Sequence, residues 1–155
     1  MKNNDNIRPV EQRDIPGLRA ILDETELFPS GLLEDMLQGF LGGTVADLWF
    51  TYVEDDQPLA FGFCEPERMT DGTWNLLAIA VLPNRHGQGI GAQMMGYLEN
   101  QLSQKGARVL IVETMGTPEF KLTRQFYKKT GYVEEACIRE FYEAGADKIV
   151  FWKHL

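Results

Sequence analysis

Apolar residues recur at two spacings in the first third of the chain, and each spacing predicts its own kind of element. Residues 7–10 predict a short strand. Asp14 and Ser30 each predict the start of an amphipathic helix, because their side-chain oxygens can accept the N–H groups of a first turn. The apolar positions at helical spacing are Leu18, Ile21 and Leu22 in the first helix and Leu33, Met36, Leu37, Phe40 and Leu41 in the second.

From residue 47 onward the pattern becomes that of strands. Residues 47–66 predict two strands joined by a turn at 55–58, where two aspartates precede Gln-Pro. A polar, glycine-containing connection follows at 68–73. Residues 74–83, WNLLAIAVLP, are almost continuously apolar, which is typical of a strand buried on both faces. This strand is therefore expected near the centre of a sheet.

The second half of the chain alternates helices and strands. Apolar residues recur every fourth position over 90–102, which predicts a helix ending near residue 106, and residues 107–113 predict a strand. Thr117 predicts the start of a last helix in which Leu122 and Phe126 share the core face, with Gly131 at its end. Residues 132–155 predict two more strands. The order is β-α-α-β-β-β-α-β-α-β-β, an α/β (α+β) class with a mixed sheet of about seven strands and four helices.

Length and composition indicate one globular domain over residues 1–155. Hydrophobic residues make up 44% of the 155 positions and charged residues 25%, close to globular averages. The N-terminal stretch lacks an export signal, and no segment approaches the roughly 18 consecutive apolar residues of a membrane span. Cys64 and Cys137 lack the spacing of a zinc or redox pair. A cytoplasmic protein with reduced thiols is expected.

Charge and missing motifs exclude several functions. A formal net charge of −8 disfavours nucleic acid and anionic membranes, so an anionic ligand has to be held by local backbone geometry. The chain has no Gly-x-Ser-x-Gly, no Lys-Ser/Thr after its glycines and no clustered histidines. Serine hydrolases, P-loop nucleotidases and metal enzymes are therefore disfavoured, and no metal is expected.

The most informative segment is the glycine loop, defined as residues 86–92 (HGQGIGA), between the apolar strand and the helix. Glycines turn backbone N–H groups toward one point, and a helix N-terminus adds donors and a positive dipole end, so such a loop can hold a phosphate. A tight turn without ligand is the simplest alternative. Gly87, Gly89 and Ala92 also fit a dinucleotide fingerprint with Glu113 as its acid, but residues 83–86 separate strand from loop and further strands of that fold are missing.

Residues 76–99, LLAIAVLPNRHGQGIGAQMMGYLE, resemble the acetyl-CoA motif of the GNAT superfamily, in which a strand ending in Val-x-Pro leads into a pyrophosphate loop. Residues 123–132, TRQFYKKTGY, resemble that family's second signature. The resemblance implies a GNAT fold of stand-alone bacterial type. It also implies acetyl-CoA as the acetyl donor and direct attack by a primary amine in a ternary complex.

The resemblance also assigns residues. Acetyl-CoA would lie between the fourth and fifth strands. Tyr127 falls at the general-acid position that protonates the departing thiolate, and Phe126 is expected in the core. The implied cofactor-binding residues are Ile79, Ala80 and Val81 for pantetheine, His86, Gly87, Gln88, Gly89, Ile90, Gly91 and Ala92 for the pyrophosphate, and Arg124 and Tyr127, with Arg85 and Lys128 as further charges.

The sequence departs from the family pattern at the base. Asn75 stands where some relatives keep a glutamate, and an amide cannot take a proton at neutral pH. Glu113 is the first candidate for the catalytic base or substrate anchor, with Asp71 and Glu65 as alternatives acting through water. A noncatalytic acyl-CoA sensor is the alternative that this departure leaves open.

The expected partners are acetyl-CoA and a small amine, amino acid or protein amino group, because an acidic surface favours cations. Segments 28–40, 65–71 and 141–147 are expected to select the acceptor. Apolar side chains on the last strands, such as Tyr142, Phe151 and Trp152, would allow a homodimer.

Overall fold

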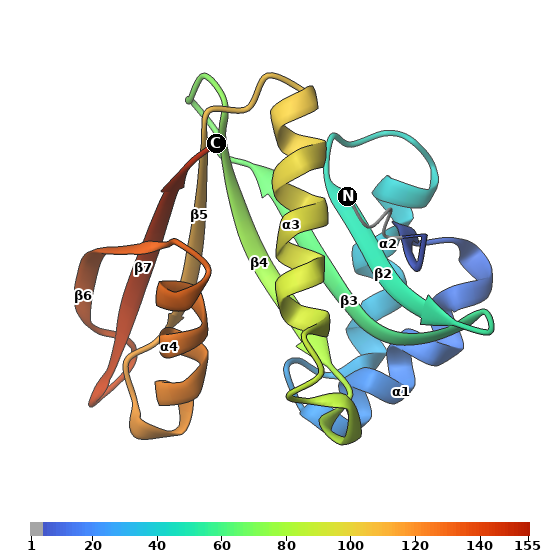
Figure 1. Cartoon of the computed structure of the whole chain (residues 1–155), viewed down its shortest axis with the longest axis horizontal. Helices are drawn as coiled ribbons and strands as arrows, with labels where there is room; N and C mark the ends of the chain where they lie inside the picture. The colour runs from blue at the N-terminus through green and yellow to red at the C-terminus, as the bar shows by residue number, and fades with distance from the viewer. Residues whose placement is uncertain (1–4) are drawn as a thin grey trace. The chain divides into compact units, whose positions relative to one another are not determined.

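A computed structural model describes residues 5–155, so residues 1–4, part of the stretch expected to lack an export signal, lie outside the described range. Among the described residues there are seven strands and four α-helices in the predicted order (Figure 1). None of these helices has the length and apolar character needed to cross a membrane. The strands are β1 (Ile7–Pro9), β2 (Leu48–Glu54), β3 (Gln57–Pro66), β4 (Thr73–Val81), β5 (Val109–Met115), β6 (Val133–Glu143) and β7 (Ala146–His154), and the helices are α1 (Ile15–Thr25), α2 (Leu33–Leu41), α3 (Ile90–Gln104) and α4 (Lys121–Lys129).

The strands are hydrogen-bonded in the order β1-β2-β3-β4-β5-β7-β6, so β4 holds the central position that its apolar sequence predicts. The β4–β5 pair is parallel, and the β1–β2, β2–β3, β5–β7 and β6–β7 pairs are antiparallel. The chain divides into two compact units, Met1–Glu65 with Leu77–Gln101 and Pro66–Leu76 with Leu102–Leu155. Both β4 and α3 therefore contribute to each unit, and a single domain over 1–155 stays a prediction.

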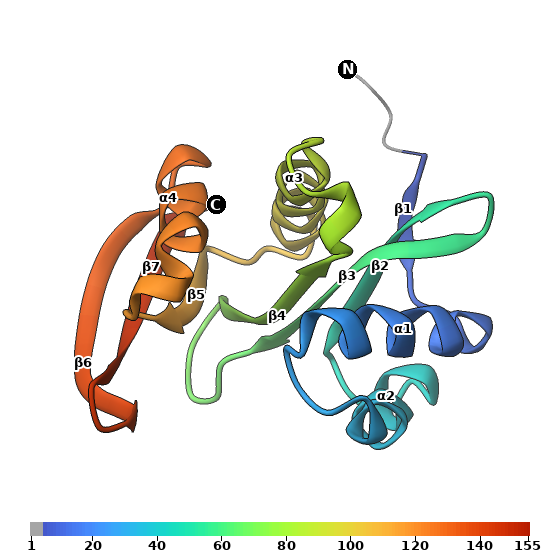
Figure 2. The same cartoon turned by 90° about the horizontal axis from the view of Figure 1, so that it is seen from below.

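The first unit is built on the β2–β3 hairpin. Helices α1 and α2 cover one face of its strands and α3 the other (Figure 2). Trp49 stacks on Phe63 with ring centroids 4.3 Å apart and on Phe61 at 6.1 Å. This packing removes large apolar surfaces from water, which is the main stabilising contribution to such a core. The buried residues of this core are Val10, Ile15, Leu18, Ile21, Leu22, Leu33, Leu37, Trp49, Phe61, Phe63, Ala78 and Ala80.

Turn and helix starts differ in detail from the sequence expectation. The hairpin turn consists of Asp55 (φ 49°) and Asp56 (φ 60°), and positive φ at both positions matches the twist of a tight hairpin, so residues 57 and 58 already belong to β3. Ser30 begins a 3₁₀ turn, and α2 starts only at Leu33. Thr117 likewise precedes a 3₁₀ turn before α4. These polar residues mark where the chain turns, and the tighter helix type was not predicted.

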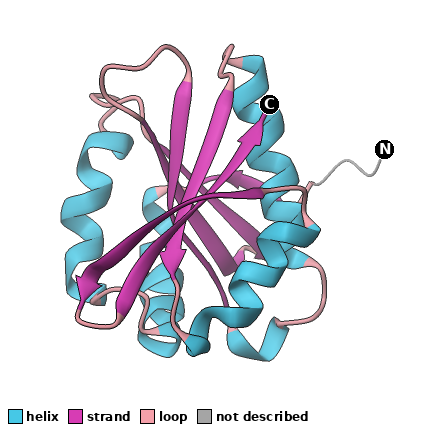
Figure 3. Ribbon diagram, turned by 90° about the vertical axis from the view of Figure 1, so that its left-hand side faces the viewer, coloured by secondary structure: helices cyan, strands magenta, loops and turns pink. Residues whose placement is uncertain are grey.

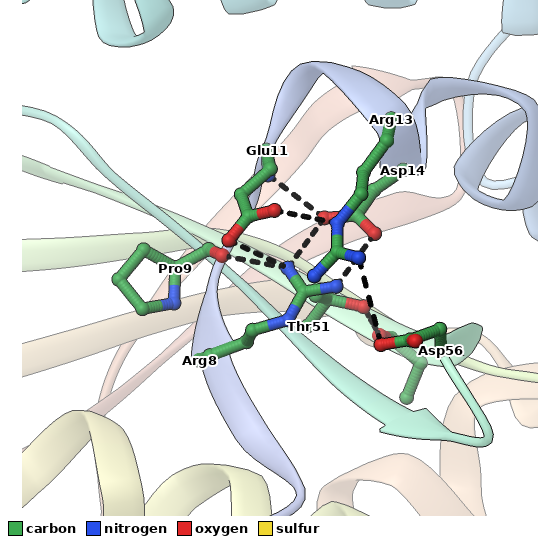
Figure 4. A network of polar contacts seen from close by, with 8 residues as sticks. Arg8, Pro9, Glu11, Arg13, Asp14, Thr51 and Asp56 are labelled. Atoms are coloured by element: carbon green, nitrogen blue, oxygen red, sulfur yellow. Dashed lines mark hydrogen bonds and ion pairs between the residues drawn. The ribbon is translucent and has the colours of Figure 1, made fainter.

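The Arg8–Asp14 network, defined as Arg8, Glu11, Arg13, Asp14 and Asp56, joins β1, the start of α1 and the hairpin turn (Figure 4). Asp14 is 1% exposed, and its two oxygens accept from the Arg8 guanidinium at 2.9 and 2.7 Å. The Glu11 N–H also donates to Asp14 Oδ2 at 2.8 Å. Burial acts to raise the pKa of Asp14, but these donors outweigh it and hold the pKa below its ordinary value. Asp14 stands at the predicted N-cap, yet its carboxylate binds Arg8 instead of capping α1.

The second unit is built on β5, β7 and β6, whose long antiparallel pairs are visible in Figure 3. The first half of β4, Thr73–Leu76, adds a parallel pair with Val109–Val112. Tyr127 of α4 lies in the core, with ring centroids 5.7 Å from Tyr132 and 5.5 Å from Phe151. These aromatic contacts hold α4 against β7 in this unit.

Candidate functional site

The glycine loop has the backbone geometry that an anion-binding turn requires. Gly87 and Gly89 have φ values of 77° and 79°, a region that side-chain-bearing residues rarely adopt. The first helical hydrogen bond of α3 runs from Gln93 N–H to the Gly89 carbonyl at 3.1 Å. The N–H groups that precede it have no acceptor within the helix and lie at its positive dipole end. The loop therefore fits a phosphate group without needing a basic side chain.

Arg85 fixes the start of this loop. Its guanidinium donates to both carboxylate oxygens of Glu54 in β2, at 2.9 and 2.6 Å, and its Nε donates to Gln88 Oε1 at 2.8 Å. Charge-assisted bidentate pairs of this kind have well-defined geometry. Arg85 thus shapes the loop through Glu54 and Gln88, a use of its charge that differs from the expected contact with phosphates.

His86 connects the loop to the end of β4. Its Nε2 lies 2.8 Å from the Val81 carbonyl, and a carbonyl can only accept, so Nε2 carries the proton in this contact. The neighbouring Leu82 N–H donates to the Leu59 carbonyl of β3 at 2.9 Å. The backbone N–H and C=O groups of successive residues point to alternate sides of a strand. Those of Ala80 therefore point toward β3, as those of Leu82 do, and those of Ile79 and Val81 point to the opposite edge of β4.

In the second unit, four polar side chains meet at the end of β5. The Glu113 cluster is defined as Glu67, Asn75, Glu113 and Lys148. The Asn75 Nδ2 amide donates to Glu67 Oε1 at 2.9 Å and to Glu113 Oε1 at 3.2 Å. Lys148 Nζ lies 3.0 Å from the same Glu113 oxygen. Among residues 5–155, the hydrogen bond and the ion pair of Glu113 both fall on Oε1, so Oε2 remains able to accept a proton.

Burial distinguishes the members of the Glu113 cluster. Asn75 is 2% exposed, and its Oδ1 is buried without a hydrogen-bond partner among the described residues. The side chain of Glu113 keeps 23% exposure and that of Lys148 13%. Lys148 Nζ also lies 4.1 Å from the centre of the Phe141 ring. The buried Asn75 amide therefore anchors the cluster, while the Glu113 carboxylate stays accessible to solvent.

A comparison with protein families decides what this arrangement belongs to. Residues 46–134 match the model described as the acetyltransferase (GNAT) domain, which covers more than half of the chain. The chain belongs to the GNAT acetyltransferase family. The family is one of acetyltransferases, which use acetyl-CoA as the acetyl donor.

The chain is similar to individual GNAT proteins over different shares of its length. The chain is 31% identical over 90 residues to the [ribosomal protein bS18]-alanine N-acetyltransferase of Haemophilus influenzae, a match that covers 58% of each protein. A GNAT-family structure from Desulfovibrio desulfuricans is 27% identical with a TM-score of 0.87, covering 96% of this chain and 97% of that one. The ribosomal-protein-S18-alanine N-acetyltransferase of Escherichia coli has a TM-score of 0.78 at 22% identity, covering 96% and 92%, and shares the fold.

The residue predicted as the general acid is buried. Tyr127 is 2% exposed, and burial raises the pKa of its hydroxyl above the ordinary range of a phenol. Phe126 was expected in the core with Leu122, but Phe126 is half-buried and Leu122 is 77% exposed. The core face of α4 is thus the one that carries Tyr127, and the expected face was wrong. A role for Tyr127 as an acid stays a prediction.

The other predicted cations of this GNAT domain lie at α4. Arg124 Nη1 donates to the Met115 and Thr117 carbonyls, both at 2.8 Å, so it closes the connection between β5 and α4. Lys128 is exposed on the same helix. Their expected contact with the donor stays a prediction, and for Arg124 the structure adds a role in shaping the end of β5.

Two members of the Glu113 cluster were not predicted from the sequence. Glu67 lies in the segment 65–71 expected to select the acceptor, but the bases considered there were Glu65 and Asp71. Asp71 is exposed, and its carbonyl accepts from Arg108 at 2.7 Å. Lys148 is paired with Met115 across β7 and β5, which brings its side chain diagonally toward Glu113. Two acids and an asparagine around one apolar strand were the only sequence signal for this cluster.

Proposed function

We propose that the protein transfers the acetyl group of acetyl-CoA to a primary amine by direct attack, with Glu113 as the catalytic base. The observation that carries this proposal is the geometry of Glu113. Asn75 and Lys148 hold its Oε1, and its Oε2 is left to take a proton. A general base has to combine a fixed position with one free acceptor atom, which this carboxylate does.

The donor is assigned to the glycine loop of the first unit. Backbone N–H groups from Gln88 to Ala92 would hold the pyrophosphate, supported by the positive φ values at Gly87 and Gly89. The described pairs of β4 with β5 extend from Thr73 to Leu76, so we assign the backbone groups of Ile79 and Val81, beyond those pairs, to the pantetheine amides. His86 occupies the Val81 carbonyl, so we assign pairing at that residue to its N–H group.

Each acetyl transfer from the thioester to an amine requires three proton transfers at the site. An acceptor ammonium gives one proton to Glu113 Oε2, and the resulting amine nitrogen attacks the thioester carbonyl carbon. The carbon–sulfur bond then breaks, and sulfur takes the phenolic proton of Tyr127. The amine nitrogen loses its second proton, through water, to the phenolate. Glu113 returns its proton to solvent, so each transfer gives one amide, one thiol and one released proton.

The state of Tyr127 supports donation during bond cleavage. Burial raises the pKa of its hydroxyl, so the phenol stays protonated at neutral pH and is also a weak acid. Full transfer ahead of cleavage would be uphill. We therefore assign the proton transfer to the moment at which negative charge develops on sulfur.

We propose a peptide or protein amino terminus as the acceptor class. The 31% identical relative is an N-acetyltransferase named for an alanine of ribosomal protein bS18, and its match includes more than half of this chain. The net charge of −8 favours a cationic acceptor over an anionic one. Ribosomal protein S18 itself is one member of this class.

The test is a thiol-release assay with purified protein and acetyl-CoA. The acceptors are a hexapeptide that begins with alanine, its N-acetylated form as the blocked control, and kanamycin as a polyamine of another class. Release with the free peptide and none with the blocked one supports the proposal. Micromolar acetyl-CoA binding by calorimetry without release from any amine would favour the acyl-CoA sensor. Absence of acetyl-CoA binding would overturn the proposal.

A further inference from the structure

Asn75 occupies a buried position of β4, and its side chain lies between two acids. Its amide nitrogen has two hydrogens, one directed to Glu67 Oε1 and one to Glu113 Oε1. Carboxylate oxygens only accept, so the amide has to present its NH₂ group to both. The orientation of Asn75 is thereby fixed from one side of the amide.

The other side of that amide contributes no constraint. Among residues 5–155, Asn75 Oδ1 is buried and has no hydrogen-bond partner. A buried acceptor without a partner lowers stability, and native structures contain few such groups. The residue is nevertheless 98% shielded from solvent, since its exposed fraction is 2%. A side chain selected only for packing would be apolar here, so the two donated hydrogen bonds are the feature that requires an amide.

We propose that Asn75 is a positioning residue for the base and that Glu67 acts through it. Asn75 holds Glu113 by Oε1 and directs Oε2 toward the acceptor, and Glu67 keeps the amide from rotating. This inference rests on the proposed function, because it needs Glu113 to be the base. No covalent role falls to Asn75 or Glu67.

The same arrangement sets the electrostatics around the base. The charged and titratable groups that face Glu113 are Glu67 from the β3–β4 connection, Lys148 from β7 and Tyr142 from β6. Glu67 and Glu113 carry −2 and Lys148 carries +1, which leaves a formal −1 on the cluster. A neighbouring negative charge makes a carboxylate easier to protonate, whereas a neighbouring ammonium makes it harder. Replacing Glu67 by glutamine therefore changes the charge beside the base while it keeps an acceptor for the Asn75 amide.

The experiment compares three variants in the thiol-release assay with the alanine hexapeptide, from pH 5 to pH 9. Asn75→Leu keeps the branching of the side chain but removes both donors, and we expect kcat to fall roughly 100-fold with an unchanged KM for acetyl-CoA. Glu67→Ala frees the amide and should lower kcat roughly 10-fold. Glu67→Gln keeps the Oε1 acceptor without its charge. It should therefore retain kcat within about threefold of wild type.

Two controls separate positioning from general damage. Glu24→Gln removes one acidic charge from the exposed surface of α1 in the other unit and should leave the profile unchanged. Circular dichroism and thermal melting verify that each variant is folded. If Asn75→Leu does not fold, the pair Glu67→Ala and Glu67→Gln decides, because Glu67 is only half-buried.

The outcomes distinguish this inference from the proposed function. Wild-type protein that releases no thiol with any amine overturns both. Active wild-type protein whose Asn75→Leu and Glu67→Ala variants keep the normal kcat and pH profile overturns only the role of Asn75. A Glu67→Gln variant as slow as Glu67→Ala would also contradict it, because a hydrogen-bond acceptor alone should suffice to hold the amide.

Discussion

The Arg8–Asp14 network and the Glu113 cluster both place a carboxylate beside a cation, but they differ in how completely that carboxylate is bonded. Asp14 is 1% exposed, and both of its oxygens accept from Arg8, with a third donor at the Glu11 N–H. Glu113 keeps 23% side-chain exposure, and its contacts fall on one oxygen. The first carboxylate is closed to further partners, and the second is open.

This difference separates stabilisation from reactivity. A buried carboxylate with every oxygen bonded lowers the free energy of the folded state only as long as its partner remains, and it has no acceptor left for a substrate proton. A carboxylate bonded on one oxygen gives up some of that stabilisation but can bind and release a proton without breaking its anchoring contacts. Loss of Asp14 should therefore lower stability and leave turnover unchanged, whereas loss of the Glu113 carboxylate should lower turnover.

The largest expected effect is on turnover at Glu113. Glu113→Gln keeps the side chain's size and removes its proton affinity, so kcat should fall by about 10²–10⁴-fold, the usual contribution of a general base. Thiol release with the alanine hexapeptide measures this, and calorimetry should give the wild-type affinity for acetyl-CoA. Glu135→Gln, an exposed acid on β6 of the same unit, is the matched control and should keep full activity. A Glu113→Gln enzyme within threefold of wild type would remove Glu113 from the mechanism.

Apolar spacing and the glycine loop made most of the fold predictable from the sequence. The order of elements is confirmed, because each strand and helix has its own apolar period. The same period failed on α4, where Leu122 and Phe126 suggested a face that the structure leaves largely exposed. A helix of 9 residues offers too few apolar positions to fix its core face, and the contacts of Tyr127 with β7 decide it.

Only part of the candidate site was predictable, for a similar reason. Glu113 could be placed from its position at the end of a predicted strand. Lys148 could not, because its approach depends on the register between β5 and β7, which is fixed by long-range pairing. Glu67 lies in the irregular connection between β3 and β4, whose conformation local sequence does not determine. Residues brought together by register and connections therefore had to come from the structure.

A smaller effect is expected at Asp14, where the free energy of unfolding changes and turnover does not. Asp14→Ala removes the carboxylate that accepts from the Arg8 guanidinium and the Glu11 N–H, so the free energy of unfolding should fall by about 3 kcal/mol. Activity per folded molecule should stay at the wild-type level, since this network carries no reacting group. Urea unfolding gives the stability, and thiol release below the transition gives the activity. Arg13→Ala, at a side chain 56% exposed, is the control and should change stability by less than about 0.5 kcal/mol.

The smallest expected effect is a pH dependence that belongs to Asp14. Arg8 and the Glu11 N–H hold the pKa of Asp14 below its ordinary value despite burial, so the folded state binds this proton more weakly than the unfolded chain does. Its stabilisation is fully present above the ordinary carboxyl pKa of about 3.9 and is lost as the pH falls through the lower folded value. Asp14→Asn cannot titrate. The difference in unfolding free energy between wild type and Asp14→Asn should thus be constant from pH 7 to pH 5 and shrink below about pH 4. A difference that stays constant down to pH 2 would mean that the charge of Asp14 does not stabilise the fold. Asp14 and Glu113 would then differ only in their effect on turnover.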